Sequence, residues 1–266
     1  MSSLSITIIQ SDLHWQDKSA NLDMFEQKIA ALSGKTELVV LPEMFSTGFS
    51  MKPALLAEKM DGVTIAWMKR VALEKKLILT GSLIIEEDGH YYNRLVWMLP
   101  NGSYGVYDKR HRFAFAGEDE QYTAGSKRLI ASVKGWRINL QVCYDLRFPV
   151  WARQATPPPA GQSFEYDVLI YAANWPERRS HAWKTLLQAR AIENQVFVVG
   201  VNRVGNDGNQ IHYNGDSMVV DPLGNILYTK AEMEDVFTIV LKKENLLELR
   251  NKFPFWRDAD EFSIFP

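Results

Sequence analysis

The sequence contains little cysteine: Cys143 is the single one among 266 residues. One cysteine excludes an intrachain disulfide and a cysteine-cluster metal site, and it is typical of a protein kept in a reducing compartment. An excess of one charge sign is also absent, because 30 lysines and arginines stand against 32 acidic residues and the formal net charge is −2. We therefore expect no nucleic-acid partner and no anionic-membrane partner.

Long apolar runs and targeting signals are absent as well. No apolar stretch approaches the roughly 18 residues that a membrane-spanning helix needs. Residues 1–12 lack the basic region of a signal peptide, and Leu4–Ile9 predicts a first strand. The chain is 46% hydrophobic, which is enough to bury a large core. We expect a cytoplasmic globular protein.

Several common catalytic motifs are missing. The sequence has no GxSxG, phosphate-binding loop, GxGxxG or HExxH, so serine hydrolases, nucleotide-binding enzymes and zincins lose most of their support. None of the five histidines is spaced with a carboxylate as a metal pair would be. We expect neither a metal nor another cofactor.

What the chain does contain is an interleaving of helical and strand patterns. The short apolar runs Leu38–Pro42 and Val168–Ala172 predict strands that are covered on both faces. Apolar residues at helical spacing predict amphipathic helices over residues 21–32 and 62–76. No repeat or linker divides the chain, so we predict a single α/β domain over residues 1–266 with a mixed sheet or a pair of sheets.

Three further segments have their own expectations. The proline-rich residues 156–161 predict a surface loop, and Ser180 predicts the N-cap of a helix that runs to about Asn194. Residues 242–266 form a C-terminal tail that is rich in aromatic residues from Phe253 onward. A tail of this composition is expected to pack on the body of the protein or on a second subunit.

The single cysteine stands at the end of a predicted strand, residues 138–142. A polar turn follows it, and residues 148–153 resemble the start of a helix. A strand, a sharp turn and a helix together can present a nucleophile. The helix N-terminus would lower the thiol pKa from its free value of about 8.5. The alternative is an inert buried cysteine.

Two charged residues stand at other predicted strand ends. Glu43 closes the strand 38–42, and Lys109 follows the predicted strand 104–108. If these ends lie beside Cys143, the glutamate is a candidate general base and the ammonium a candidate oxyanion stabiliser. Such a set performs acyl transfer through a cysteine thioester. The alternative is that both are solvated strand-end charges or members of an ordinary ion pair.

The segments around these three residues resemble a known family. Residues 41–45 (LPEMF), 107–111 (YDKRH) and 141–149 (QVCYDLRFP) are similar, in this order, to the three motifs of the carbon–nitrogen hydrolase (nitrilase) superfamily. The similarity continues through residues 183–194 and 215–217 and covers nearly the whole chain.

This resemblance implies a fold, a subunit arrangement and residue roles. The implied fold is a four-layer α-β-β-α sandwich of the nitrilase type, which forms a homodimer through its helices. Glu43 would be the general base, Lys109 the oxyanion stabiliser and Cys143 the nucleophile. Many members carry a further glutamate after the lysine. By its spacing to Gly125 we favour Glu118, with Glu120 as second choice and an ordinary loop charge as the alternative.

Within the superfamily, residues 143–149 and 174–178 resemble the omega-amidase branch. Its members hydrolyse the terminal amide of 2-oxo-dicarboxylate monoamides, such as 2-oxoglutaramate and 2-oxosuccinamate, to the 2-oxo acid and ammonia. Arg147 is a candidate bidentate partner of the substrate carboxylate, or else a residue that orders the turn. Tyr144 would offer its backbone N–H to the oxyanion. Asn174 and Trp175 would line the pocket, although Trp175 could instead serve packing.

Other interpretations stay open at this point. The same triad could act on a nitrile, an N-carbamoyl amino acid or another aliphatic amide. A catalytically silent scaffold is disfavoured, because all three triad positions carry the required residue types. Arg190 and Glu193 are read as a structural pair on one helix face. Residues 215–217 are read as a turn into the strand that starts at Met218.

Overall fold

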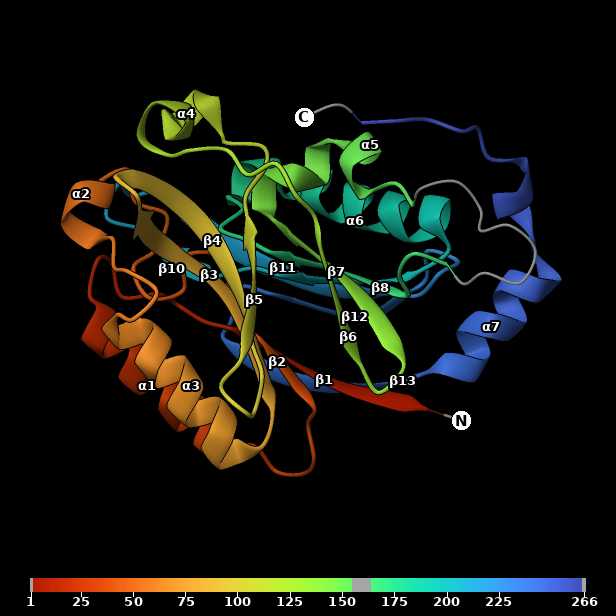
Figure 1. The fold of residues 1–266 in the computed structure, drawn as a ribbon, viewed down its shortest axis with the longest axis horizontal. Helices are drawn as coiled ribbons and strands as arrows, with labels where there is room; N and C mark the ends of the chain where they lie inside the picture. Colours follow the sequence, from red (N-terminus) through yellow and green to blue (C-terminus); the bar gives the residue numbers. More distant parts are fainter. Residues whose placement is uncertain (1, 155–163, 265–266) are drawn as a thin grey trace.

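Two β-sheets pack face to face in the computed structural model, which describes residues 2–154 and 164–264 (Figure 1). The first sheet has six strands in the order β13-β1-β2-β3-β4-β5. The second has seven, in the order β10-β11-β9-β8-β7-β6, with β12 paired to β11. The strands of the first sheet are β1 (Ser3–Gln10), β2 (Leu38–Val40), β3 (Ile78–Glu87), β4 (His90–Met98), β5 (Tyr104–Asp108) and β13 (Asp235–Lys242). Those of the second are β6 (Leu129–Val133), β7 (Trp136–Val142), β8 (Val168–Ala172), β9 (Phe197–Val201), β10 (Val204–Asn206), β11 (His212–Val220) and β12 (Ile226–Ala231).

Helices cover the outer faces of both sheets. In Figure 1 the long helices α1 and α3 lie together outside the first sheet, and α6 lies outside the second. The result is four layers, helix, sheet, sheet and helix, as predicted. The helices are α1 (Lys18–Ala30), α2 (Pro53–Leu56), α3 (Val63–Lys75), α4 (Glu118–Gln121), α5 (Pro149–Ala152), α6 (Ser180–Asn194) and α7 (Lys243–Lys252). None of the described helices has the length and hydropathy to cross a membrane.

The apolar runs of the sequence correspond to strands that are buried on both faces. In β2, Leu38 and Val40 join the core between the two sheets, whereas Val39 joins the core under α1 and α3. Side chains of a strand alternate between its faces, so a strand with a core on each side has no solvent-facing position. The continuous run of apolar residues follows from this double burial.

The carboxyl ends of the parallel strands carry the segments that contain the candidate site residues. Strands β1, β2 and β3 are mutually parallel, and so are β7, β8 and β9. Glu43 lies just beyond the end of β2, Cys143 directly follows β7, and Asn174 lies just beyond β8. Ligands of α/β proteins bind outside the carboxyl ends of such strands, so this edge is where a site is expected.

The structure differs from the sequence-based predictions at three places. The helix predicted after the cysteine is a single turn, α5, because Arg153 already leaves the helical region with ψ 132°. Ser180 is the first residue of α6 and not its cap, since its hydroxyl bonds to Asp216 instead. Residues 215–217 lie inside β11, at a register shift against β12, and are not a turn.

Two predicted segments fall partly or wholly outside the described residues. The loop predicted at 156–161 lies outside them, as does Phe265. The described part of the tail has contacts with the body: the Trp256 ring lies edge-on to Phe164 at 5.3 Å, and Gln195 Nε2 donates to the Phe253 carbonyl at 2.8 Å. Phe255, in contrast, is 65% exposed.

Candidate active site

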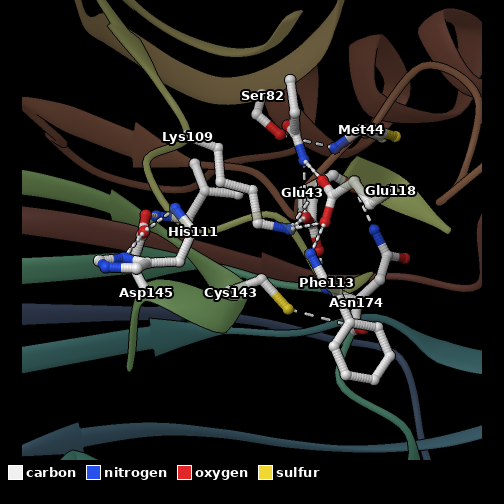
Figure 2. Close-up of polar contacts among 12 residues, drawn as sticks. Glu43, Met44, Ser82, Lys109, His111, Phe113, Glu118, Cys143, Asp145 and Asn174 are labelled. Carbon is white, nitrogen blue, oxygen red and sulfur yellow. Dashed lines mark hydrogen bonds and ion pairs between the residues drawn. The ribbon is translucent and has the colours of Figure 1, made fainter. Parts of the chain in front are cut away.

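A buried lysine held by two carboxylates forms the centre of the site (Figure 2). Lys109 Nζ lies 2.9 Å from Glu43 Oε1, and 2.9 and 2.8 Å from Glu118 Oε1 and Oε2. All three side chains are buried. Glu118 is the first residue of α4, whereas Glu120 in the same short helix is exposed to solvent. The structure thus places Glu118, the favoured glutamate, beside Lys109 and Glu43, and it leaves Glu120, the second choice, in solvent.

The charges of this cluster shift each other's protonation. Burial alone would lower the pKa of Lys109, but the carboxylates of Glu118 and Glu43 outweigh it and raise that pKa. The pKa of Glu118 is also raised, by burial first and by the nearby Glu43 charge, against the opposing effect of Lys109. One ammonium cannot fully neutralise two carboxylates in a dry site. Lys109 therefore stays charged.

An asparagine that the sequence analysis missed joins the two carboxylates. Asn93, inside β4, donates through Nδ2 to Glu43 Oε1 at 2.8 Å and to Glu118 Oε1 at 3.1 Å. Its backbone carbonyl accepts the Lys109 N–H at 3.0 Å. A fully buried amide in the interior of a strand is the signal that could have drawn attention to it.

Cys143 sits in a backbone conformation that L-residues rarely adopt. It opens a 3-10 turn, Cys143–Arg147, with φ at +45°. Such left-handed strain costs about 1–3 kcal/mol and is common at active sites, including the nucleophile turns of hydrolases. Sγ donates to the Asn174 carbonyl at 3.8 Å. In Figure 2 the sulfur points toward Asn174, beside the cluster of Lys109, Glu43 and Glu118.

The expectation of a thiol with lowered pKa is wrong for this site. Burial, followed by the negative charge of Glu43, raises the pKa of Cys143 well above its ordinary value, and Lys109 compensates only in part. The helix that was expected to supply positive charge is only one turn, α5, which begins at Pro149. The thiol is therefore neutral at physiological pH, and its proton needs an acceptor at the moment of attack.

Asn174 connects Cys143 with Glu43. Its backbone N–H donates to Glu43 Oε2 at 2.8 Å, and its Nδ2 donates to the Glu43 carbonyl at 2.5 Å. The Asn174 carbonyl accepts from the thiol on the other side. The residue predicted to line the pocket thus also fixes the orientation of the Glu43 carboxylate relative to Cys143.

Asp145 links the turn that begins at Cys143 to the segment that follows Lys109. This buried carboxylate accepts from the His111 N–H at 2.9 Å and from the Tyr107 hydroxyl at 2.6 Å. It also contacts His111 Nδ1 at 2.8 Å and accepts the Val142 N–H at 3.0 Å. Four contacts to one carboxylate fix two segments that are far apart in sequence, so the relative position of lysine and thiol is set by this link.

A small cavity of about 20 Å³ opens beside the thiol. The four residues predicted to bind substrate all line it, together with three that were not predicted. The lining residues are Phe113, Cys143, Tyr144, Arg147, Asn174, Trp175, Pro176 and Arg179. Arg179 and Phe113 belong to loops after β8 and β5, where no motif marked them.

Other predicted features are also visible. Arg190 pairs with Glu193 at 3.0 Å and donates to the Leu146 carbonyl at 2.5 Å, as expected of a structural arginine. In the part of the chain that the structure describes, no group of three or more His, Cys, Asp or Glu side chains is arranged to hold a metal ion. A carboxylate near a thiol can accept its proton, and an ammonium can stabilise an oxyanion.

The match to a family model agrees with this site and fold. The carbon-nitrogen hydrolase model matches residues 5–250. The chain therefore belongs to the carbon–nitrogen hydrolase family, and it is a hydrolase of carbon–nitrogen bonds. The predicted family and the predicted α/β sandwich are confirmed.

Full-length relatives narrow the similarity further. The chain is 43% identical to the omega-amidase YafV of Escherichia coli (strain K12) over 266 residues and the whole of both chains. It is 30% identical to the 2-oxoglutaramate amidase of Bacillus subtilis (strain 168), over 96% of each chain. Its fold matches that of XC1258 from Xanthomonas campestris with a TM-score of 0.97, 44% identity and full coverage of both chains. That structure is described as a CN-hydrolase superfamily protein with an arsenic adduct in its active site.

Proposed function

We propose that this protein is an omega-amidase. It hydrolyses the terminal amide of 2-oxo-dicarboxylate monoamides, 2-oxoglutaramate and 2-oxosuccinamate, to the 2-oxo acid and ammonia. The observation that carries the proposal is the buried Lys109 held by two carboxylates next to the strained thiol of Cys143. The full-length relatives with omega-amidase and 2-oxoglutaramate amidase names support the substrate class.

Acylation begins with the neutral thiol. Glu43 accepts the Cys143 proton while sulfur forms a bond to the amide carbon, so no free thiolate is required beforehand. The carbonyl oxygen becomes an oxyanion that receives hydrogen bonds from Lys109 Nζ and the Tyr144 N–H. One such donor contributes about 10²–10³ to the rate.

The tetrahedral intermediate then releases ammonia. The protonated Glu43 gives its proton to the amide nitrogen, the C–N bond breaks, and the acyl group remains on sulfur as a thioester. Glu43 next accepts a proton from a water molecule as its oxygen attacks the thioester carbon. The C–S bond breaks and the sulfur takes the proton back from Glu43. Amide and water have become carboxylic acid and ammonia.

Glu118 acts on this cycle through the lysine. Both oxygens of Glu118 receive hydrogen bonds from Lys109 Nζ, and they keep the ammonium charged and in position. Because the Lys109 pKa is raised, the lysine is an unsuitable proton donor and acts as a fixed positive charge. Glu118 is thus a positioning residue.

We also propose how the protein assembles and where it is located. We propose that residues 1–266 form one domain, with 242–266 as a tail, and that two copies dimerise through their helices. Support comes from exposed apolar side chains on and near α5, such as Val150 at 56% and Phe255 at 65% exposure. A single cysteine fits a cytoplasmic location. Light scattering coupled to size-exclusion chromatography tests the dimer, and a monomer at micromolar concentration contradicts it.

A substrate panel tests the proposed activity. Ammonia release is measured with 2-oxoglutaramate, glutamine and an N-carbamoyl amino acid, and carboxylate formation with an aliphatic nitrile. We expect 2-oxoglutaramate to have the highest kcat/KM. A higher value for the nitrile or the carbamoyl compound would keep the triad and overturn the omega-amidase assignment.

A further inference from the structure

Two guanidinium groups line the cavity and form no ion pair with any residue that the structure describes. Arg147 and Arg179 both line the cavity that contains Cys143. Among the described residues, no carboxylate lies within ion-pair distance of either guanidinium, and neither donates a side-chain hydrogen bond. Arginine side chains in a binding cavity without a protein partner are suited to a carboxylate of a ligand, which they bind through two parallel N–H donors.

Aromatic rings hold both groups in place. The Arg179 guanidinium carbon lies 4.9 Å from the centre of the Phe113 ring, and that of Arg147 lies 5.1 Å from the Trp175 ring. Stacking on a ring orients a guanidinium and leaves the N–H donors at its edge free. Trp175 Nε1 also donates to the Arg179 carbonyl at 2.8 Å, which links the two supports.

The positive charges of Arg147 and Arg179 favour binding of an anion in the cavity. Burial lowers the pKa of Arg179, and the positive charges of Arg178 and Arg147 lower it further. Such like-charge repulsion is relieved when a negative group binds between the cations. Arg178 is exposed and does not line the cavity, so Arg147 and Arg179 are the two donors in reach of a ligand.

We infer that Arg179, with Arg147 as a second donor, binds the 2-oxo carboxylate at the far end of the substrate while its amide lies at Cys143. This inference rests on the proposed function and adds the residue that sets its specificity. Arg179 is partly buried, whereas Arg147 is exposed, so Arg179 is the main anchor. Neutral amides lack the group that it binds.

Phe113 joins this anchor to the acid–base cluster. Its ring covers the Arg179 guanidinium, and its backbone N–H donates to Glu118 Oε2 at 2.5 Å. Glu118 in turn holds Lys109. Binding of the carboxylate therefore fixes Phe113 and, through it, the lysine. Remote binding that is used in the transition state raises kcat as well as lowering KM.

A pair of substrates and three variants test the inference. 4-Oxopentanamide keeps the chain and ketone of 2-oxoglutaramate but has a methyl group in place of the carboxylate. We expect the wild type to favour 2-oxoglutaramate, and Arg179→Ala to reduce the ratio of the two kcat/KM values on the order of 10²-fold. Arg179→Lys keeps the charge without the planar fork and is expected to reduce it about tenfold.

Arg178→Ala is the matched control, since it removes an equal charge one residue away. We expect it to leave the ratio within about twofold of the wild type. Retained hydrolysis of 4-oxopentanamide shows that each variant is folded. If Arg179→Ala and Arg179→Lys lower kcat/KM equally on both substrates, Arg179 has a structural role and the inference is wrong. If Arg178→Ala lowers the ratio as much as Arg179→Ala does, the preference comes from the general positive charge and not from Arg179. A wild type that hydrolyses neither amide overturns the proposed function itself.

Discussion

Replacing Glu118 by glutamine probes how the lysine is held. Both oxygens of Glu118 face donors: Oε1 faces Lys109 at 2.9 Å and Asn93 at 3.1 Å, and Oε2 faces Lys109 at 2.8 Å and the Phe113 N–H at 2.5 Å. A glutamine amide has one acceptor oxygen and one NH2 donor. In either orientation the NH2 group meets two donors, so Lys109 is pushed from its position.

The magnitude follows from these contacts. A hydrogen bond to a charged group contributes about 1.5–3 kcal/mol, and a misplaced oxyanion donor costs about 10²–10³ in rate. We expect Glu118→Gln to lower kcat on 2-oxoglutaramate about 10²-fold or more, to change KM less than about threefold, and to lower the free energy of unfolding by about 2 kcal/mol. Steady-state kinetics and urea unfolding measure the two effects.

Glu120→Gln is the control, because Glu120 lies in the same short helix but is exposed. It is expected to keep kcat and to change the free energy of unfolding by less than about 0.5 kcal/mol. Full activity of Glu118→Gln, or an equal loss in Glu120→Gln, would refute the reasoning that Glu118 positions the lysine.

Three further predictions concern the thiol and its supports. Burial and the Glu43 charge raise the pKa of Cys143 in the folded protein. The neutral thiol therefore contributes to the free energy of unfolding below the ordinary thiol pKa, and this contribution is lost as the pH rises through the raised pKa. Alkylation by iodoacetamide should therefore titrate with a midpoint above about 8.5, and a lower midpoint contradicts this. Asn93→Ala removes the donor shared by two carboxylates, so urea unfolding should show a loss of about 2 kcal/mol together with a lower kcat; unchanged kcat would restrict Asn93 to stability. Asp145→Asn turns an NH2 group toward one of the four groups that contact Asp145. We expect it to lower the free energy of unfolding in urea by about 2–3 kcal/mol, and a loss below about 0.5 kcal/mol would contradict the linking role of Asp145.

The buried strands could be predicted because burial requires a continuous run of apolar residues in the sequence. A strand such as β2, with one core on each face, must be apolar at every position. The residues at strand ends could be predicted for a related reason: a charged or chemically reactive residue that ends an apolar run at the carboxyl end of a strand is placed where sites form. Glu43 and Cys143 follow this rule.

The rest of the site depends on contacts that no local pattern encodes. Asn93 lies inside β4, and its two carboxylate partners lie 50 and 25 residues away in sequence. Arg179 is the last residue of a short 3-10 turn, Glu177–Arg179, and only the path of the chain after β8 brings it to the cavity. The direction of the Cys143 pKa was missed because burial, which a local motif does not report, outweighs the nearby positive charge.

The central claim is that Cys143 is the nucleophile of an amide hydrolysis. The most direct test compares ammonia release from 2-oxoglutaramate by the wild type, Cys143→Ala and Cys143→Ser under the same conditions. The proposed mechanism predicts rapid release by the wild type and a loss of at least about 10³-fold in both variants, which lack the thiol that forms the thioester. Release that continues at a comparable rate in Cys143→Ala would contradict it.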